Sequence, residues 1–194
     1  IEKIQDDENI VTILPITRDL LENPAGQYLL FATRKGLIKK TMLEEYVRIN
    51  RNGKYAIKLG EKIGAEGDTL VNVRPATDSS DVVMISSTGK ASRFACSRIS
   101  TTSRNTSGVW GIFTGDRKNS NRSGDGGYVV GMVATEDFES EILTISKFGM
   151  AKRSRMGTSV KIPDLDSEGI QKNDKDGNLK FVNDGYTRTS PGAM

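Results

Sequence analysis

The chain has 194 residues, of which 36% are hydrophobic, and carries a formal net charge of +3. Its single cysteine, Cys96, excludes an intramolecular disulfide, and the absence of histidine removes the commonest metal ligand and general base. Because no apolar run approaches the roughly 18 residues of a membrane helix and no signal-peptide layout is present, we expect a soluble, cytoplasmic protein.

Short apolar runs recur along the chain, each of the length typical of buried strands. They come as three copies of one order, a strand candidate followed by a hairpin pattern: 9–15 with 29–41, 69–75 with 82–94, and 128–134 with 142–154. A glycine opens a further strand candidate in two copies, Gly53 before KYAIKL and Gly108 before VWGI. The sequence therefore predicts an all-β repeat protein with units of about the size of a propeller blade.

Each hairpin pattern has a glycine at its eighth place, namely Gly36, Gly89 and Gly149. These positions fit three-residue hairpin turns whose last residue takes a positive φ, so we expect all three glycines to share that conformation. The only helix expected is short, from Thr41 to Tyr46, with Thr41 and Glu44 forming a capping box.

The repeat divides one domain into units of about 1–58, 59–118 and 119–194, with a polar insertion at 155–186. A second glycine-rich loop covers 114–127. Residues from Tyr186 begin the equivalent of the Gly53 and Gly108 motifs, so we expect the chain to be a piece of a longer polypeptide.

Charge alternates in phase with the repeat. Residues 34–58 carry eight bases and two acids, 88–108 carry four bases and no acid, and 147–161 carry five bases and no acid. The intervening segments 61–81 and 134–141 are acidic. A fold that stacks equivalent parts of each unit would gather the bases along one edge.

The chain resembles the C-terminal domain of the gyrase A protein, and that of its paralogue in topoisomerase IV. The resemblance extends in register from DENIVTILPI and YLLFATRKGLIKKT through NGKYAIKL, GKASRF and SGVWGI to GGYVVGMVA and GMAKRS. The family's basic gyrase box has no match here, which leaves the choice between DNA gyrase and topoisomerase IV open.

The resemblance implies a six-bladed β-pinwheel, of which this chain covers roughly three to four blades, with double-stranded DNA wrapped around its basic rim. It also implies a parent type II topoisomerase, a bacterial A2B2 assembly with an ATPase B subunit that supercoils DNA negatively and uses ATP and Mg²⁺ elsewhere. For the chain itself it implies no catalytic residue, metal or cofactor.

The candidate DNA-binding residues are the bases around each hairpin and on the loops that follow. Those around the hairpins are Arg34, Lys35, Lys39, Lys40, Lys90, Arg93, Lys147, Lys152, Arg153 and Arg155. Those on the loops are Arg48, Arg51, Lys54, Arg98, Arg104 and Arg188. One basic cluster per blade can follow the phosphate backbone without reading bases.

Two other functions stay open from the residues alone. The chain could be a propeller-like protein-interaction scaffold whose bases are incidental, or it could stack single strands on exposed aromatics. Aromatics make up only 6% of the chain, and we expect most of them, such as Phe31, Phe94 and Trp110, in the core.

Apparent catalytic or metal motifs fail on inspection. Thr88-Gly89-Lys90 lacks the first glycine and the final Ser or Thr of a phosphate-binding loop. The opening of a calcium loop at Asp164, Asp166 and Glu168 has Lys175 at its twelfth position instead of a bidentate Glu. We therefore expect no enzyme activity and no calcium site in this chain.

Overall fold

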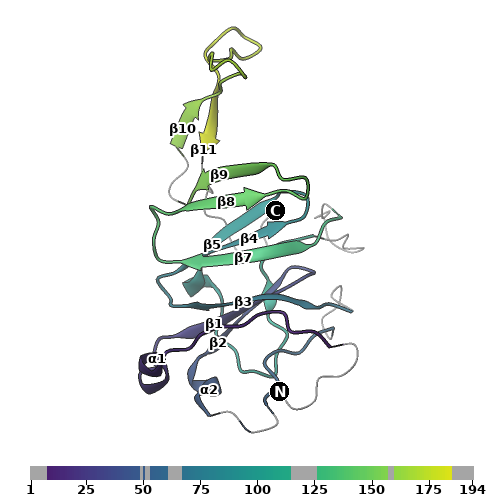
Figure 1. Ribbon diagram of the computed structural model, residues 1–194, viewed down its shortest axis with the longest axis vertical. Coiled ribbons are helices and arrows are strands. Elements are labelled where there is room, and N and C mark those ends of the chain that lie inside the picture. Colours follow the sequence, from purple (N-terminus) through teal and green to yellow (C-terminus); the bar gives the residue numbers. More distant parts are fainter. Residues whose placement is uncertain are drawn as a thin grey trace. The chain divides into compact units, whose positions relative to one another are not determined.

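The computed structural model describes residues 8–48, 50, 53–60, 67–114, 126–156 and 160–184. The chain forms two compact units, residues 1–136 with 188–194, and residues 137–187. Figure 1 shows the strands of both units.

The first unit contains two antiparallel sheets. One has the order β3-β1-β2-β6 and the other the order β5-β4-β7. Their strands are β1 (Tyr28–Thr33), β2 (Leu37–Met42), β3 (Leu70–Ala76), β4 (Asp81–Ser86), β5 (Ala91–Ala95), β6 (Val109–Trp110) and β7 (Val129–Thr135). Short helices α1 (Arg18–Glu22) and α2 (Glu44–Val47) and a 3-10 turn (Cys96–Arg98) complete the unit.

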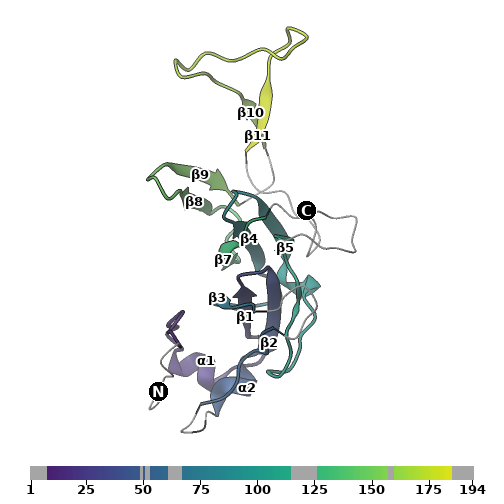
Figure 2. The same cartoon turned by 90° about the vertical axis from the view of Figure 1, so that its right-hand side faces the viewer.

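Each sheet contains strands from two sequence units. The hairpin β1–β2 pairs on one side with β3 and on the other with β6, both of which come from the next sequence unit. In the same way β4 pairs with β7, and both pairings shift register at the same place, between Ala32 and Thr33 in β1 and between Ile85 and Ser86 in β4. Successive sequence units are therefore joined by hydrogen-bonded strands within the first compact unit (Figures 1 and 2).

The main core lies between the two sheets. Leu30 and Ile38 of the first sheet pack in one cluster with Met84, Phe94 and Val129 of the second, and all five are almost completely buried. A second cluster covers the opposite face of the first sheet. It contains Leu29, Phe31, Tyr46 and Val73, and Leu14 of the N-terminal segment packs against it. The first sheet is thus buried on both faces, which explains the continuous apolar character of β1.

The second unit consists of two hairpins. One joins β8 (Glu141–Ile145) to β9 (Ala151–Arg155), and the other joins β10 (Val160–Pro163) to β11 (Phe181–Asp184). Two tight turns lie eight residues apart in the segment between β10 and β11. Asp166 accepts the backbone N–H groups of Glu168 and Ile170, and Asp174 accepts those of Asp176 and Asn178.

The prediction for the three hairpin glycines is confirmed. Gly36, Gly89 and Gly149 have φ values of 104°, 85° and 83°. Gly36 is also required sterically, because a Cβ there would overlap the carbonyl oxygen of Ile112. The Gly36 carbonyl accepts the N–H groups of Gly111 and Ile112 at 2.9 and 3.2 Å, so this turn joins the first hairpin to the segment after β6.

Two predicted strands do not form. Residues 9–15 and the KYAIKL segment at 54–59 have no regular secondary structure. Their equivalents β3 and β7 pair with the hairpin directly before them, and β6 pairs with β2, in the hairpin of the preceding sequence unit. By the same rules both 9–15 and 54–59 need a hairpin that comes before residues 9–15, and the described residues contain none there.

The predicted helix is present but shifted. It runs from Glu44 to Val47, and its N-cap is Leu43, which makes no side-chain cap hydrogen bond. The expected capping box is wrong because Thr41 belongs to β2 and is buried there. The strand pairing of Leu29 with Thr41 holds this residue in extended geometry.

Candidate nucleic-acid interface

The hairpin register places one recurrent base in the same position of each hairpin. Lys40, Arg93 and Arg153 lie opposite Leu30, Val83 and Leu143. Arg93 donates from Nε to Asp81 Oδ2 at 2.7 Å, and Arg153 Nε lies 2.7 Å from Glu141 Oε2. Asp81 and Glu141 both stand directly before the hairpin pattern, so the ion pair recurs with the repeat.

The first hairpin uses a variant of this pairing. Tyr28 stands in the place of Asp81 and Glu141, and the Lys40 ammonium lies 4.4 Å from the centre of its ring. Lys40 Nζ also donates to Asp78 Oδ1 at 2.6 Å, and this hydrogen bond holds the pKa of Asp78 below its ordinary value. In each hairpin the recurrent base, Lys40, Arg93 or Arg153, therefore contacts the residue directly before the hairpin pattern, which is Tyr28, Asp81 or Glu141.

Three predicted interface bases are buried. Lys39, Lys40 and Arg93 expose 0%, 3% and 6% of their surface. The expectation that these side chains lie on a basic rim is wrong for this structure, because the strand register turns them toward protein partners. The sequence could not distinguish them from exposed bases, since residue type and spacing are the same in Arg153, which is 73% exposed.

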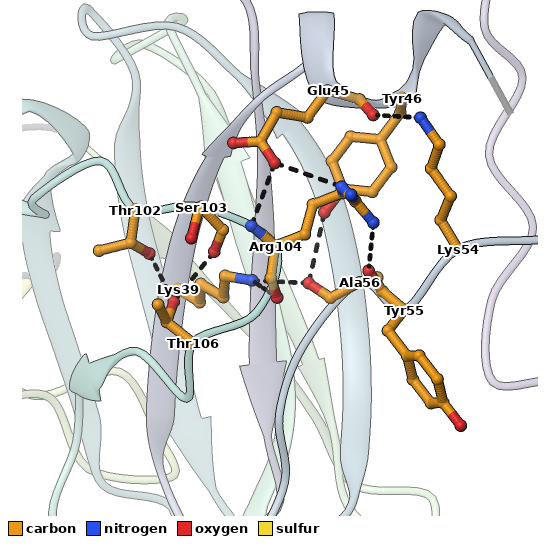
Figure 3. Close-up of polar contacts among 10 residues, drawn as sticks. All are labelled: Lys39, Glu45, Tyr46, Lys54, Tyr55, Ala56, Thr102, Ser103, Arg104 and Thr106. Atoms are coloured by element: carbon orange, nitrogen blue, oxygen red, sulfur yellow. Dashed lines mark hydrogen bonds and ion pairs between the residues drawn. The ribbon is translucent and has the colours of Figure 1, made fainter.

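Lys39 is the centre of a polar network that we call the loop junction: Lys39, Glu45, Lys54, Tyr55, Ala56 and Arg104 (Figure 3). Lys39 Nζ donates to the carbonyl oxygens of Ala56 at 2.6 Å and Arg104 at 2.5 Å. Arg104 in turn donates from its backbone N–H to Glu45 Oε2 at 3.1 Å and from Nη1 to the Tyr55 carbonyl at 3.2 Å.

Burial changes the acid–base properties of this network. The pKa of Lys39 is lowered to about 8, chiefly by desolvation; the Glu45 carboxylate opposes this shift and the Arg104 guanidinium adds to it. Burial also raises the pKa of Tyr46, whose hydroxyl donates to the Ala56 carbonyl at 3.3 Å, to about 12. The lysine therefore sits near its titration point at the alkaline edge of the physiological range.

A cavity of about 510 Å³ adjoins the loop junction. It is lined by Pro24, Glu44, Glu45, Val47, Arg48, Lys54 and Arg104. The structure thus brings together three of the predicted interface bases, Arg48, Lys54 and Arg104, from three separate segments. Glu45 contacts Lys54 through its backbone carbonyl and Arg104 through its carboxylate. It was not among the residues singled out by sequence, because an acid within the basic segment 34–58 gives no signal of that role.

The remaining predicted bases of the first unit are exposed or partly exposed. Arg34, Arg48, Lys90 and Arg98 are exposed, whereas Lys35, Lys54 and Arg104 are partly buried. Arg34 lies at the tip of the first hairpin with its guanidinium 3.7 Å from the centre of the Tyr128 ring. Arg74 on β3 is exposed as well, and sequence analysis missed it because it stands alone in an acidic segment.

In the second unit Lys147, Lys152, Arg153 and Arg155 are all exposed. The calcium-loop residues are used otherwise: Asp164 pairs with Lys172 at 3.2 Å and with Lys180 at 2.6 Å. No cluster of three potential metal ligands occurs among the described residues. Arg51 and Arg188 lie outside the described residues.

Comparison with known proteins decides the family. The sequence model of the DNA gyrase C-terminal domain, a beta-propeller, matches residues 27–77, 80–136 and 140–158. The chain belongs to this family. The all-β, propeller-like architecture predicted from the sequence is confirmed. Each of the three matched segments begins at a hairpin. The first two end with β3 and β7, so their limits follow the hydrogen-bonded sheets.

Curated relatives of this gyrase C-terminal domain include the DNA gyrase A protein of Deinococcus deserti, 36% identical over 79% of the chain, and that of Escherichia coli K12, 34% identical over 78%. The chain spans only 17% and 15% of the lengths of these two proteins. Within the described residues no helix is long and apolar enough to cross a membrane.

Solved structures show the same fold. The C-terminal domain of DNA topoisomerase IV superimposes with a TM-score of 0.62 at 19% identity, over 98% of this chain and 62% of that one. The DNA gyrase A C-terminal domain gives a TM-score of 0.53 at 23% identity, over 84% of this chain and 50% of that one. Both likenesses concern the fold alone.

Proposed function

We propose that this chain binds double-stranded DNA through exposed bases and takes no catalytic part itself. The observation that carries the proposal is that exposed bases recur around the hairpins and on the loops that follow them, and that segments 88–108 and 147–161 hold bases without any acid. In the described residues they are Arg34, Arg48, Arg74, Lys90, Arg98, Lys147, Lys152, Arg153 and Arg155. Neutralising successive phosphates releases counterions, which supplies affinity without base reading.

The partly buried Lys35, Lys54 and Arg104 complete the proposed surface. Lys54 and Arg104 line the cavity at the loop junction together with Arg48. Each of these three cations can approach a different oxygen of one phosphate group. Glu44 and Glu45 line the same cavity, and Glu45 pairs with Arg104 at 3.3 Å, which holds Arg104 in place.

At the level of the whole protein, we propose that the chain is the DNA-wrapping part of the A protein of a type II topoisomerase. Relatives that are DNA gyrase A proteins support gyrase over the topoisomerase IV alternative. Such an enzyme acts in the cytoplasm with a partner ATPase, uses ATP and Mg²⁺ outside this chain, and introduces negative supercoils. Bending DNA over 20 to 30 base pairs costs about 1–6 kcal/mol, which contacts on successive blades would offset.

The binding test is a titration of a fluorescent duplex at salt concentrations between about 50 and 200 mM. We expect affinity to fall steeply with salt, with little difference between duplex sequences. The variant Arg98→Ala should reduce the slope of log affinity against log salt by about 0.9, the value for one phosphate contact. Lys175→Ala, which removes an exposed base outside the proposed surface, is the matched control and should leave the slope unchanged.

Two outcomes would contradict the proposal. Salt-insensitive or undetectable duplex binding favours the protein-interaction scaffold. Preferential binding of single strands favours stacking, for which Tyr55 and Phe148, 84% and 90% exposed beside Lys54 and Lys147, are the available aromatics. If the chain binds the duplex, energy transfer between dyes on the two duplex ends measures the bending of the DNA directly.

A further inference from the structure

Lys39 differs from the bases of the proposed surface because it is buried and cannot reach DNA. Its side chain is completely buried, and its ammonium group is directed at two protein carbonyls, those of Ala56 and Arg104. A buried ammonium is costly unless it is hydrogen-bonded, so this arrangement must be held by the surrounding structure.

The two carbonyls belong to segments without strands or helices. Residues 53–59 and 102–107 are irregular, and they are linked to each other by the Lys58 N–H, which donates to the Thr106 carbonyl at 3.1 Å, and by Arg104 Nη1 to the Tyr55 carbonyl. Lys39 binds both segments from the rigid strand β2. It therefore ties two irregular backbones to one sheet (Figure 3).

The same contacts fix the direction of Arg104. Its backbone carbonyl is held by Lys39, while Glu45 accepts its backbone N–H and lies 3.3 Å from its Nε. Lys54 donates from Nζ to the Glu45 carbonyl at 3.3 Å. Without Lys39, the Arg104 carbonyl would lose the side-chain donor that holds it, and the Ala56 carbonyl would keep the Tyr46 hydroxyl at 3.3 Å.

We propose that Lys39 is a positioning residue, which holds Arg104 so that the Arg104 side chain forms one phosphate-binding surface with Lys54 and Arg48. This inference rests on the proposed DNA-binding function. Lys39 acts through Arg104 and touches no DNA. The hairpin repeat supplies a matched comparison: Lys152 occupies the equivalent place in the third hairpin and is exposed.

The experiment compares duplex binding of the 194-residue chain with the variants Lys39→Met, Lys39→Gln, Arg104→Ala, Lys39→Met/Arg104→Ala and Lys152→Met. Lys39→Met should weaken binding about threefold to tenfold and lower the salt slope by no more than about 0.9, the value for one phosphate contact, because it displaces Arg104 and removes no other base. Lys39→Gln keeps two N–H donors without a charge and should restore part of the affinity. Lys152→Met should lower the slope by about 0.9.

The double variant separates positioning from independent contact. If Lys39 acts through Arg104, Lys39→Met/Arg104→Ala should bind no more weakly than Arg104→Ala alone. Additive losses, unchanged affinity of Lys39→Met, or unchanged affinity of Arg104→Ala would each overturn the inference while leaving DNA binding itself intact. No duplex binding by the wild-type chain would instead refute the proposed function.

A measurement on the wild-type chain keeps the inference testable if the Lys39 variants do not fold. Amine acylation read by mass spectrometry should leave Lys39 unmodified both with and without DNA, whereas Lys152 should be modified when free and protected by the duplex. Modification of Lys39 in the free chain would contradict its buried positioning role.

Discussion

Asp81 and Arg93 form a buried ion pair across the second hairpin, with Arg93 Nε 2.7 Å from Asp81 Oδ2. Neither residue exposes more than 6% of its surface. The pair recurs at the same hairpin positions in Glu141 and Arg153, where both side chains are more exposed. The same ion pair of the repeat is therefore buried in one hairpin and more exposed in the other, so the two pairs can be compared directly.

We expect Arg93→Met to lower the free energy of unfolding by about 3–5 kcal/mol, because it leaves the Asp81 carboxylate buried without its cation. Arg153→Met is the exposed control and should change stability by less than about 1 kcal/mol. Urea denaturation followed by circular dichroism measures both. Equal effects of the two substitutions would show that burial of the pair does not matter.

A second prediction concerns the first hairpin turn. Gly36→Ala should destabilise the chain by about 2–5 kcal/mol, since it combines a positive φ with a Cβ that overlaps the Ile112 carbonyl. Gly89 has a similar φ but open space around its Cα, so Gly89→Ala should cost only about 1–2 kcal/mol. Thermal unfolding of both variants checks the order, and a larger loss for Gly89→Ala would contradict it.

The lowered pKa of Lys39 predicts a pH effect with a defined sign. Between pH of about 8 and the ordinary value of 10.5 the unfolded chain binds more protons at this lysine than the folded chain. The free energy of unfolding contributed by Lys39 therefore rises with pH in this window and is constant below it.

The measurement is the difference in unfolding free energy between wild type and Lys39→Met from pH 7 to 9.5. The unfolding free energy of wild type minus that of Lys39→Met should increase above pH of about 8. Tyr46 and Cys96, with pKa values raised to about 12 and 11 by burial, titrate in both proteins and cancel. The charged groups that face Lys39 are Glu45 and Arg104. A flat or falling difference would refute the prediction.

Cys96 provides a probe of opening of the main core. Its thiol is completely buried and burial raises its pKa to about 11, so the reactive thiolate is scarce and inaccessible in the native state. We expect a thiol reagent at pH 8 to label Cys96 only as fast as the unit unfolds, and rapidly in urea. Fast labelling in native buffer would indicate that the core opens locally.

Much of the fold was predictable from local chemistry. The three hairpins, their glycine turns and the all-β class follow from short apolar runs and from turn residues that must adopt positive φ, and these signals act within about thirteen residues. The predicted strands 9–15 and 54–59 failed because strand formation requires a neighbouring strand. Which neighbour is available depends on connections far along the chain.

The candidate site, like the fold, was predictable from the sequence only in part. The sequence alone determined the repeat, the family resemblance and the alternation of basic and acidic segments, since these properties are carried by residue type and order. Only the tertiary structure decided that Lys39, Lys40 and Arg93 are buried whereas Lys152 and Arg153 are exposed. The physical reason is that the first two hairpins are covered by other parts of the first unit, so the same position in the repeat points into a packed interior in one copy and to solvent in another.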